Sequence, residues 1–314
     1  MKKKKILLLL VIMCFLLTGC SKNLKDKDNK IVKNEVTGQN LVANILCQPT
    51  AKSTIEKYVE NKVEIKKLPE CKNYKVTDGG YEGIWTTIFV KPLAWFVLKI
   101  GYLVKNFGLA VIIATLLIRL LLVPFTKKAA MQSENMKLIK PEMDKLEKKY
   151  AGKNDNNSMV MKAQEMSLLY KKYNISPAAG CLFSFIQLPL FLAFYEALYR
   201  LPAVFEGKFL FYDLGVTPLI AISAGKWYYL ILVVLVFAVT YFSFKLNVGA
   251  SMGPEQEKQM KTMRNISLVM IGTASLSVST AIALYWITNS SFTILQNLYV
   301  KYVKKGDKKN DRRK

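Results

Sequence analysis

The stretch AVIIATLLIRLLLVPFT, residues 110 to 126, has the composition of a membrane span but carries an arginine near its middle. Apart from Arg119, its only polar residues are Thr115 and Thr126. An arginine at the centre of a membrane helix costs roughly 2.5–3.5 kcal/mol on insertion scales. Another part of the chain, or water, therefore has to stabilise this charge, and Arg119 is a candidate functional residue.

Long apolar runs define the class of the whole chain, which is 52% hydrophobic. A transmembrane helix needs about 20 mainly apolar residues. Runs of this kind lie at 107–126, 181–199, 227–244 and 266–300, and the last is long enough for two spans. The sequence therefore predicts an all-α membrane protein with five transmembrane helices.

The first twenty residues, MKKKKILLLLVIMCFLLTGC, combine a lysine-rich start, an apolar run and a small-residue end. This pattern is typical of a secretory signal rather than a span. Its end, Leu17-Thr18-Gly19-Cys20, resembles the lipobox of bacterial lipoproteins, in which cleavage precedes a cysteine that is then lipidated. The alternative is an ordinary signal peptide with an incidental cysteine. The lipobox predicts a signal peptide at 1–19 and a lipoprotein whose Cys20 carries a lipid such as palmitate on the outer face of a bacterial cytoplasmic membrane.

The segment 20–83 then forms a lipid-anchored extracellular region. Residues 21–83 hold 12 basic and 9 acidic residues, and the early part, KNLKDKDNKIVKNEVTGQ, is predicted to be a flexible tether. Cys47 and Cys71 are consistent with two free thiols or with a disulfide. A disulfide would close a loop of about 25 residues and contribute roughly 3 kcal/mol in the chain-entropy model.

Basic residues in the connecting segments order the topology, because cytoplasmic loops of membrane proteins carry an excess of lysine and arginine. Segment 127–175 holds 11 basic and 6 acidic residues, and the tail 301–314 holds 8 basic and 2 acidic residues. Segment 201–226 has two of each. We therefore expect the first two in the cytoplasm and the third outside.

The segment 84–106 is apolar enough to be a sixth span, but lysines at 91, 99 and 105 and a proline at 92 interrupt it. If it crossed the membrane, the basic segment 127–175 would lie outside, against the charge rule. We predict an amphipathic helix on the outer surface, with Trp85, Trp95 and Tyr102 at headgroup depth.

These arguments give a complete order of segments with an outside start and a cytoplasmic end. After the signal peptide and the extracellular region follow an interfacial amphipathic helix 84–106, a first span 107–126, a cytoplasmic helical hairpin 127–175, a second span 176–200, an extracellular loop 201–226, a third span 227–245, a cytoplasmic loop 246–263, a fourth span 264–278, a fifth span 280–300 and a basic cytoplasmic tail 301–314.

The charge of Arg119 has one candidate acid within the spans, which is Glu196. At 1.5 Å rise per residue, the two lie at depths that differ by roughly 12 Å, so a direct ion pair is not expected. Polar residues recur instead at helical spacing in each of four spans: Thr115 with Arg119, Ser184 with Gln187, Thr240 with Ser243 and Asn247, and Tyr285 with Asn289, Thr293 and Gln296. Any one of these sets is explained by contacts between helices. Together with the arginine they predict a hydrophilic, cationic groove inside the bundle.

Several classes of function lack their residues in this chain. The chain contains no histidine, no C-x-x-C pair and no Walker-type phosphate-binding motif, so we expect no metal, no cofactor and no enzymatic reaction. A small-anion transporter or channel remains an alternative in which Arg119 binds the ion. A structural membrane chaperone subunit is a second alternative.

The segment 127–175 predicts two antiparallel helices around Gly152, with Ser158 as an N-cap. Apolar residues step at helical spacing in both halves: Ile139, Met143, Leu146 and Tyr150, and then Met159, Ala163, Met166, Tyr170 and Tyr173. They pack against each other in the simplest interpretation. The second interpretation is a docking surface, because Met131, Met136, Met143, Met159, Met161 and Met166 form an adaptable apolar face.

Four segments together resemble the YidC/Oxa family of membrane protein insertases, in the lipoprotein form of Gram-positive bacteria. They are TLLIRLLLVPFTKKAAMQ (115–132), KPEMDKLEKKY (140–150), NISPAAGCLFSFIQLPLFLAFYEALYR (174–200) and ALYWITNSSFTILQNLYV (283–300). The resemblance covers about residues 84–303. The chain departs from the family at Phe183 and near Ser279, where prolines are common.

The resemblance implies that Arg119 lies in a groove open to cytoplasm and lipid and attracts acidic residues of a nascent membrane protein. It also implies that Gln187, Thr240, Ser243, Tyr285, Trp286 and Asn289 line this groove or the path into lipid. The hairpin would capture substrate, and the basic tail would contact the ribosome. From its charge alone, the basic tail could bind RNA, bind anionic lipid or only set the orientation of the chain in the membrane. No recognition of a specific nucleic-acid sequence is expected. The resemblance leaves open whether the chain acts alone or with the Sec translocon.

Overall fold

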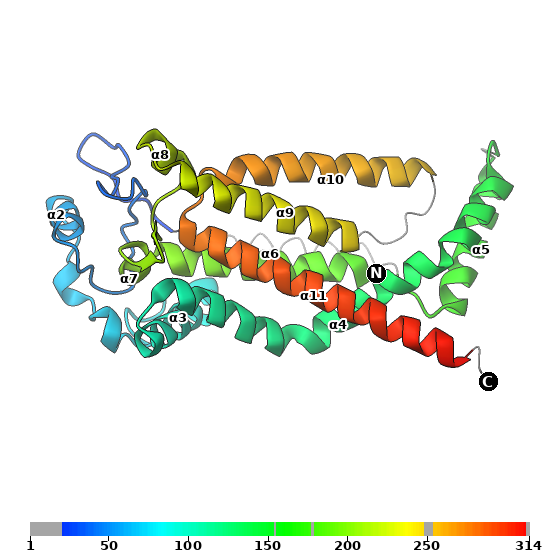
Figure 1. The fold of residues 1–314 in the computed structure, drawn as a ribbon, viewed down its shortest axis with the longest axis horizontal. Helices are drawn as coiled ribbons and strands as arrows, with labels where there is room; N and C mark the ends of the chain where they lie inside the picture. Colours follow the sequence, from blue (N-terminus) through cyan, green and yellow to red (C-terminus); the bar gives the residue numbers. More distant parts are fainter. Residues whose placement is uncertain (1–20, 154, 177–178, 248–253, 312–314) are drawn as a thin grey trace. The chain divides into compact units, whose positions relative to one another are not determined.

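The computed structural model describes residues 21–153, 155–176, 179–247 and 254–311 (Figure 1). These residues are mainly α-helical, as the sequence predicts, with a single two-stranded antiparallel sheet. The chain divides into two compact parts. The first part comprises residues up to 117 with 187–234 and 274–288, and the second comprises 118–186, 235–273 and 289–314. The predicted signal peptide and Cys20 lie outside the described residues.

Three helical segments among the described residues are long and apolar enough to cross a membrane: Thr86–Val104, Phe107–Tyr150 and Trp227–Leu246. The second and third contain the predicted first and third spans. The first is the segment predicted to lie on the outer surface, and it consists of a short π-helix, η4 (Thr86–Val90), followed by helix α3 (Lys91–Val104).

The other predicted spans also coincide with helices. Helix α6 (Ala179–Tyr199) occupies the predicted second span, and α10 (Pro254–Ser275) and α11 (Thr280–Asp311) contain most of the fourth and fifth. Helix α10 begins ten residues before the predicted span and ends at Ser275, so the predicted cytoplasmic loop 246–263 is partly helical. Side chains of residues 179–186, which include Ser184, and of Asn247 are not among those described.

Helix α4 (Phe107–Tyr150) is continuous over 44 residues, so the predicted boundary after residue 126 is not a break in the helix. The sequence there, KKAAMQ, consists of strong helix formers without glycine. Pro124 and Pro141 lie inside this helix. Each proline lacks a backbone donor, but the turns around it retain their helical geometry.

In the first part of the structure, the N-terminal module (residues 21–83) is folded. Antiparallel bridges join Asn23 to Val42, Lys25 to Ile31 and Lys33 to Asn40. Its buried cluster is formed by Leu24, Val32, Leu41, Val42, Ile45, Tyr58, Ile65 and Phe205.

The prediction of a flexible tether over residues 22–39 is therefore wrong. Two widely spaced apolar residues, Leu24 and Val32, reach the buried cluster, and the polar residues between them form turns rather than solvated coil. The Asn34 side chain accepts from the backbone N–H of Val36 and of Thr37 at 3.0 Å. The sequence of this stretch, with its few apolar residues, gives no indication that these residues pack against distant segments of the chain.

The rest of the module contains helix α2 (Lys52–Glu60) and the short helices η2 (Ile65–Lys67) and η3 (Cys71–Asn73). Cys47 and Cys71 are both buried and form a disulfide with Cα atoms 4.8 Å apart. Helix α2 begins without a side-chain cap of its own. The Glu206 carboxylate substitutes for it by accepting from the N–H groups of Thr50 at 2.9 Å and Ala51 at 3.2 Å.

The segment 201–226 adds small elements to this part, of which Figure 1 labels α7 and α8. They are α7 (Pro202–Phe205), β1 (Lys208–Phe209), β2 (Tyr212–Asp213) and α8 (Pro218–Ser223), followed by η5 (Trp227–Tyr229) and α9 (Leu230–Asn247). The first residues of α11 donate to this segment: Thr280 N–H to the Val216 carbonyl at 3.0 Å and Ala281 N–H to the Leu214 carbonyl at 2.9 Å. Two of the orphan donors at that helix start are thereby satisfied.

In the second part, α5 (Asn156–Lys172) folds back along the end of α4 as the predicted helical hairpin. Ile139, Met143 and Ile175 are buried, and Met166, Tyr170 and Tyr173 pack against them. Met159 and Ala163 are exposed, so the packed stripe is shorter than predicted. The N-cap is Asp155 rather than Ser158, because the Asp155 carboxylate accepts from the Ser158 N–H at 2.8 Å.

Candidate functional site

Arg119 is buried in the second part of the structure, with 2% of its surface exposed. Its Nε donates to the Asn289 Oδ1 of helix α11 at 2.5 Å. The sequence predicted no ion pair between Arg119 and Glu196 and did not join Arg119 to Asn289; the structure adds this hydrogen bond. A neutral amide oxygen stabilises a guanidinium through a charge-assisted hydrogen bond but does not neutralise it.

A second hydrogen bond fixes the register of the same two helices. The Gln296 Nε2 of α11 donates to the Thr126 Oγ1 of α4 at 2.8 Å. The two bonds are seven residues apart on both helices, so these stretches of α4 and α11 run in the same direction. Thr126 and Asn289 are buried, and Gln296 is partly buried. Polar side chains of the fifth predicted span therefore face the arginine helix.

Hydroxyl groups of the predicted groove bond mainly to their own helices. Thr240 is buried, and its Oγ1 donates to the Val236 carbonyl at 2.6 Å. Thr293 Oγ1 donates in the same way to the Asn289 carbonyl at 3.0 Å. Ser243 is half-buried on α9. A threonine bonded to the carbonyl four residues earlier is satisfied without water or ligand.

The other predicted groove residues lie in the first part of the structure. Thr115 is buried, and its Oγ1 donates to the Val111 carbonyl of its own helix at 2.7 Å. Gln187 is half-buried on α6. The structure therefore groups Arg119, Thr240, Ser243 and Asn289 in one part, and Thr115, Gln187, Tyr285 and Trp286 in the other.

Tyr285 and Trp286 form an aromatic cluster with α6. The Tyr285 ring stacks on Phe194 with centroids 4.6 Å apart, and Trp286 meets Phe191 edge-on at 5.1 Å. Tyr285 is buried, whereas Trp286 is half-buried. Offset and edge-to-face arrangements of this kind are the favoured geometries of aromatic rings. These two residues give the fifth predicted span a rigid aromatic contact with the second.

The first part of the structure contains a buried cluster of charges that was not predicted from the sequence. Arg200, with 1% of its side chain exposed, pairs with Glu196 at 3.2 Å and with Glu82 at 2.5 Å. Glu82 also pairs with the buried Lys91 at 3.1 Å, and the Trp85 Nε1 donates to Glu196 at 3.0 Å. Glu196 lies on α6, and Arg200 directly follows its last residue. Their four-residue spacing is the sequence feature from which this pair could have been predicted.

This charge cluster joins the N-terminal module to the end of α6. The Arg200 Nε donates to the Asn44 carbonyl at 2.6 Å, and the Leu46 N–H donates to the Arg200 carbonyl at 3.0 Å. Arg200 presents several N–H donors in a planar fork, which suits contact with more than one acceptor. The module is therefore attached to α6 by both side-chain and backbone hydrogen bonds.

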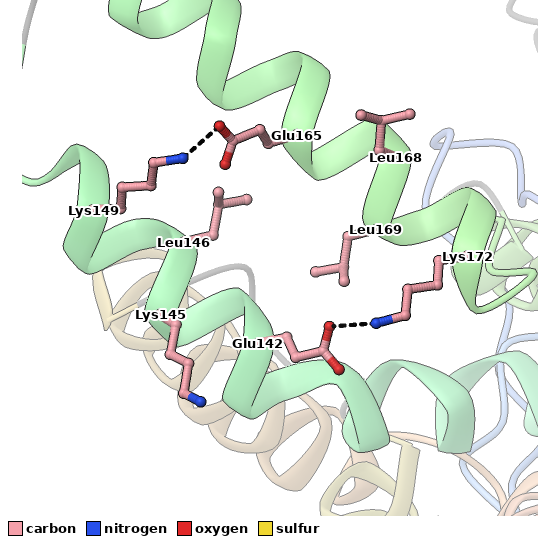
Figure 2. A pocket seen from close by; sticks show the side chains of 8 residues that line it. All are labelled: Glu142, Lys145, Leu146, Lys149, Glu165, Leu168, Leu169 and Lys172. Carbon is pink, nitrogen blue, oxygen red and sulfur yellow. Dashed lines mark hydrogen bonds and ion pairs between the residues drawn. The ribbon is translucent and has the colours of Figure 1, made fainter.

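The helical hairpin contains a pocket of about 570 Å³ between α4 and α5. Figure 2 shows its ion pairs, Lys149 with Glu165 at 2.6 Å and Lys172 with Glu142 at 3.4 Å, around Leu146 and Leu169. Lys145 and Leu168 complete its lining.

Hydrogen bonds favour the charged form of both glutamates in this hairpin. The Tyr173 hydroxyl and Lys172 lower the pKa of the Glu142 carboxyl below its ordinary value. Lys149 and the Tyr150 hydroxyl lower the pKa of Glu165. The two helices are therefore joined by carboxylates that remain ionised at neutral pH.

Half of the predicted methionine surface is exposed. Met131, Met159 and Met161 are exposed, whereas Met136, Met143 and Met166 contribute to the packed core of the hairpin. The predicted basic tail begins inside α11, which continues to Asp311. Lys304 Nζ donates to the Met131 carbonyl at 3.5 Å, so the start of the tail contacts α4.

Known proteins similar to this chain are membrane protein insertases. Residues 99–308 match the family described as 60Kd inner membrane protein. The YidC insertase of Oceanobacillus iheyensis is 34% identical over 224 residues, which cover 70% of this chain and 84% of that protein. The chain belongs to the YidC/Oxa insertase family. The MisCA insertase of Bacillus subtilis is 33% identical over 218 residues, covering 69% of this chain and 79% of MisCA.

A solved structure described as an active YidC insertase with its first transmembrane domain resolved is 24% identical to this family member and has a TM-score of 0.48. The match covers 78% of this chain and 51% of that chain, so the present chain spans about half of it.

Proposed function

We propose that this chain inserts nascent membrane proteins into the bilayer by receiving them beside Arg119 and releasing them sideways into lipid. The observation that carries the proposal is the buried Arg119 guanidinium, bonded to the amide of Asn289 within apolar helices. The similarity to proteins named membrane protein insertases supports it.

The mechanism is physical and contains no chemical reaction and no cofactor. Arg119 keeps its positive charge because an arginine guanidinium is not deprotonated in proteins, and in this proposal the charge attracts acidic residues in the hydrophilic end of a substrate. Thr115, Gln187, Thr240, Ser243, Tyr285, Trp286 and Asn289 line the groove or its exit in this proposal. Transfer of about 20 apolar residues into lipid then supplies the driving force.

The proposed topology has five spans, an outer N-terminus and a cytoplasmic C-terminus in a bacterial cytoplasmic membrane. The lipobox at residues 17–20 supports a lipid anchor on Cys20 after removal of the signal peptide. The charge counts of 127–175, 201–226 and 301–314 support the orientation.

Contacts at both ends of the 84–106 segment support its position on the outer surface. At its start, Trp85 donates to Glu196 near the outer end of the proposed second span. At its end, the Asn106 Nδ2 donates to the Lys208 carbonyl in the proposed extracellular loop, at 3.3 Å. A helix with both ends at the same face of the membrane does not cross it.

Two cytoplasmic elements supply the proposed contacts with partners. The hairpin receives substrate, which the exposed Met131, Met159 and Met161 support, because methionine side chains adapt to varied apolar partners. The basic tail contacts the ribosome or anionic lipid in this proposal. Its composition, 8 basic and 2 acidic residues, supports such a contact. The Sec translocon is a further proposed partner.

The test is insertion into liposomes that contain only the purified chain. The substrate is a single-span protein with a short acidic tail, and its control carries a neutral tail of the same length. The Arg119→Ala variant should insert the acidic substrate roughly tenfold less well, because a hydrogen bond to a charged group is worth about 1.5–3 kcal/mol. The neutral substrate should be affected less, and Arg119→Lys should retain part of the activity.

Three outcomes separate the alternatives at equal amounts of folded protein. Insertion no better than in empty liposomes contradicts an autonomous insertase, and anion flux through the same liposomes would then indicate a channel. Equal losses for both substrates would reduce Arg119 to a structural residue. Equal insertion by wild type and Arg119→Ala would remove Arg119 from the mechanism while leaving the insertase intact.

A further inference from the structure

The hairpin formed by β1 and β2 presents two exposed apolar side chains at its turn. Phe209 pairs with Tyr212, so Leu210 and Phe211 form a two-residue loop. The exposed fractions are 74% for Leu210 and 61% for Phe211. Trp227, at the start of the apolar segment Trp227–Leu246, is 64% exposed. Most of the surface of these three large apolar side chains is therefore not buried by the described residues.

The turn itself is unfavourable for an aqueous setting. Two-residue hairpin loops favour asparagine and glycine, because their backbone angles include positive φ. Leu210 has a φ of 54°, a conformation that is strained for a residue with a branched apolar side chain. In water the chain would thus combine a strained turn with two exposed apolar groups. A lipid environment removes the second disadvantage.

Hydrogen bonds attach the hairpin to the start of the third proposed span. The Asp213 N–H donates to the Tyr229 hydroxyl at 2.8 Å, and the Tyr212 hydroxyl donates to the Tyr228 carbonyl at 3.2 Å. The Phe211 ring meets Tyr228 edge-on with centroids 5.4 Å apart. The turn is therefore held at the level where this apolar helix begins.

The other side of the hairpin lies against the first residues of α4. The Asn106 side chain donates to the Lys208 carbonyl, and the space beside Gly108 is filled by the Phe209 side chain, whose own Cβ is 2.3 Å and whose ring Cγ is 2.6 Å from where a Cβ of residue 108 would lie. Any larger residue at position 108 would displace Phe209. The hairpin consequently joins the outer ends of the first and third proposed spans. These two contacts fix the depth of the hairpin relative to the bilayer.

The chemistry around the turn matches the boundary between acyl chains and headgroups. Tyrosine and tryptophan favour this boundary, where Tyr228 and Trp227 would lie. Lys208 and Lys226 flank the turn, exposed and paired with Asp213 at 3.4 and 3.5 Å. Lysines beside an apolar tip are suited to lipid phosphates.

We propose that Leu210 and Phe211 insert into the outer leaflet and that the β1–β2 hairpin is a lipid anchor for the ends of the first and third spans. The proposal depends on the proposed crossing of those two spans and is independent of the insertase activity. Its partner is the acyl-chain region of the bilayer, rather than a protein.

Depth-dependent fluorescence quenching tests the proposal on the full chain in bilayers. Leu210→Cys and, separately, Phe211→Cys are labelled with an environment-sensitive nitrobenzoxadiazole dye in a background with Cys14 and Cys181 changed to serine. The same background without the new cysteine serves as the blank for any label on Cys20. Val36→Cys is the control for water, because Val36 is 70% exposed in the N-terminal module, and Val234→Cys is the control for lipid on α9.

The expected result is blue-shifted emission at positions 210 and 211, with loss of emission when lipids carry a nitroxide on the upper acyl chain, as for position 234. Emission like that of position 36, quenched by aqueous iodide and not by the lipid nitroxide, would overturn the proposal. Blue-shifted emission that neither quencher reduces would also overturn it, because a protein surface would then cover the turn. The use of two positions protects the test from one variant that fails to fold. If the full chain shows this quenching but does not insert substrates, the insertase function is contradicted and the lipid-anchor proposal is supported.

Discussion

At the scale of single residues, the hydrogen bond between Arg119 and Asn289 offers a test of what the charge of Arg119 does. Asn289→Asp would replace a neutral acceptor by a carboxylate in the same position and so place a negative charge beside the guanidinium. We expect a folded protein whose insertion of acidic-tailed substrates falls to the level of Arg119→Ala. Asn289→Ala should instead lower the free energy of unfolding by about 1.5–3 kcal/mol, because a buried charged donor loses an acceptor.

The measurements are insertion in liposomes and thermal unfolding in the same lipid. Thr288→Ala, next to Asn289, is a suitable control, because the Thr288 hydroxyl bonds only within its helix in the contacts described. Normal insertion by Asn289→Asp would show that a negative charge placed beside Arg119 does not hinder acidic-tailed substrates.

Arg200 carries the second prediction at this scale. Arg200→Ala would leave the buried Glu196 and the partly buried Glu82 without their shared cation. We expect a loss of about 3–5 kcal/mol in the free energy of unfolding, as for other broken buried pairs. Arg200→Ala combined with Glu196→Gln should recover part of this loss, because one uncompensated charge is removed. Thermal unfolding of the three proteins checks this, and equal stability of the single and double variants would contradict the role of charge.

The sequence located Arg119 and Asn289 correctly as polar residues on apolar helices, but it did not join them. Helical spacing shows which residues share a face of one helix, and it gives no register between helices that are 170 positions apart. The Glu196–Arg200 pair was accessible from its four-residue spacing. Glu82 and Lys91 were not, because they approach Arg200 only through the folded N-terminal module.

At the scale of elements, the helical hairpin of α4 and α5 should loosen in acid. The pKa values of Glu142 and Glu165 are lowered in the folded hairpin. The stabilising contribution of such a group is complete above the ordinary glutamate pKa and disappears as the pH falls through the lowered value. We therefore expect α5 to remain packed on α4 at neutral pH and to separate increasingly below about pH 4.

Spin labels at positions 161 on α5 and 138 on α4, both exposed sites, would report the separation as a distance. The double variant Glu142→Gln with Glu165→Gln should show a smaller change in distance between pH 7 and pH 3, with only the weaker Lys162–Glu147 pair at 3.9 Å still joining the two helices through a carboxylate. A wild-type distance that is also constant over this range would show that apolar packing alone holds the hairpin.

The element boundaries differ in how far the sequence could predict them. The hairpin followed from two apolar stripes, because both helices pack locally and need no distant partner. The continuity of α4 through residue 127 was not predicted, because a change from apolar to basic composition marks a change of solvent rather than an end of a helix. The helical start of α10 was missed for the same reason.

At the scale of the whole molecule, the folded N-terminal module is the main difference from the sequence prediction. Its buried cluster includes Phe205 from the segment after α6, so its core is completed by residues over a hundred positions away. Neither the few apolar residues of 21–83 nor their spacing could show this. A module with a core of this size depends on additional restraints, and the Cys47–Cys71 disulfide is one.

Removing the disulfide tests how the module contributes to the molecule. The variant with both Cys47→Ser and Cys71→Ser should lose about 3 kcal/mol of module stability, because the unfolded loop gains chain entropy. The lower stability should be visible as faster proteolysis within residues 21–83. Backbone N–H groups of the module still donate to Arg200 and Glu206, so the module remains attached to the rest of this part when it is folded. Because residues 21–83 contribute none of the proposed groove residues, insertion at equal folded amounts should stay near the wild-type level. Proteolysis rates and liposome insertion measured on the same preparation check both expectations. A loss of insertion that matches Arg119→Ala would show that the module acts on the substrate path itself.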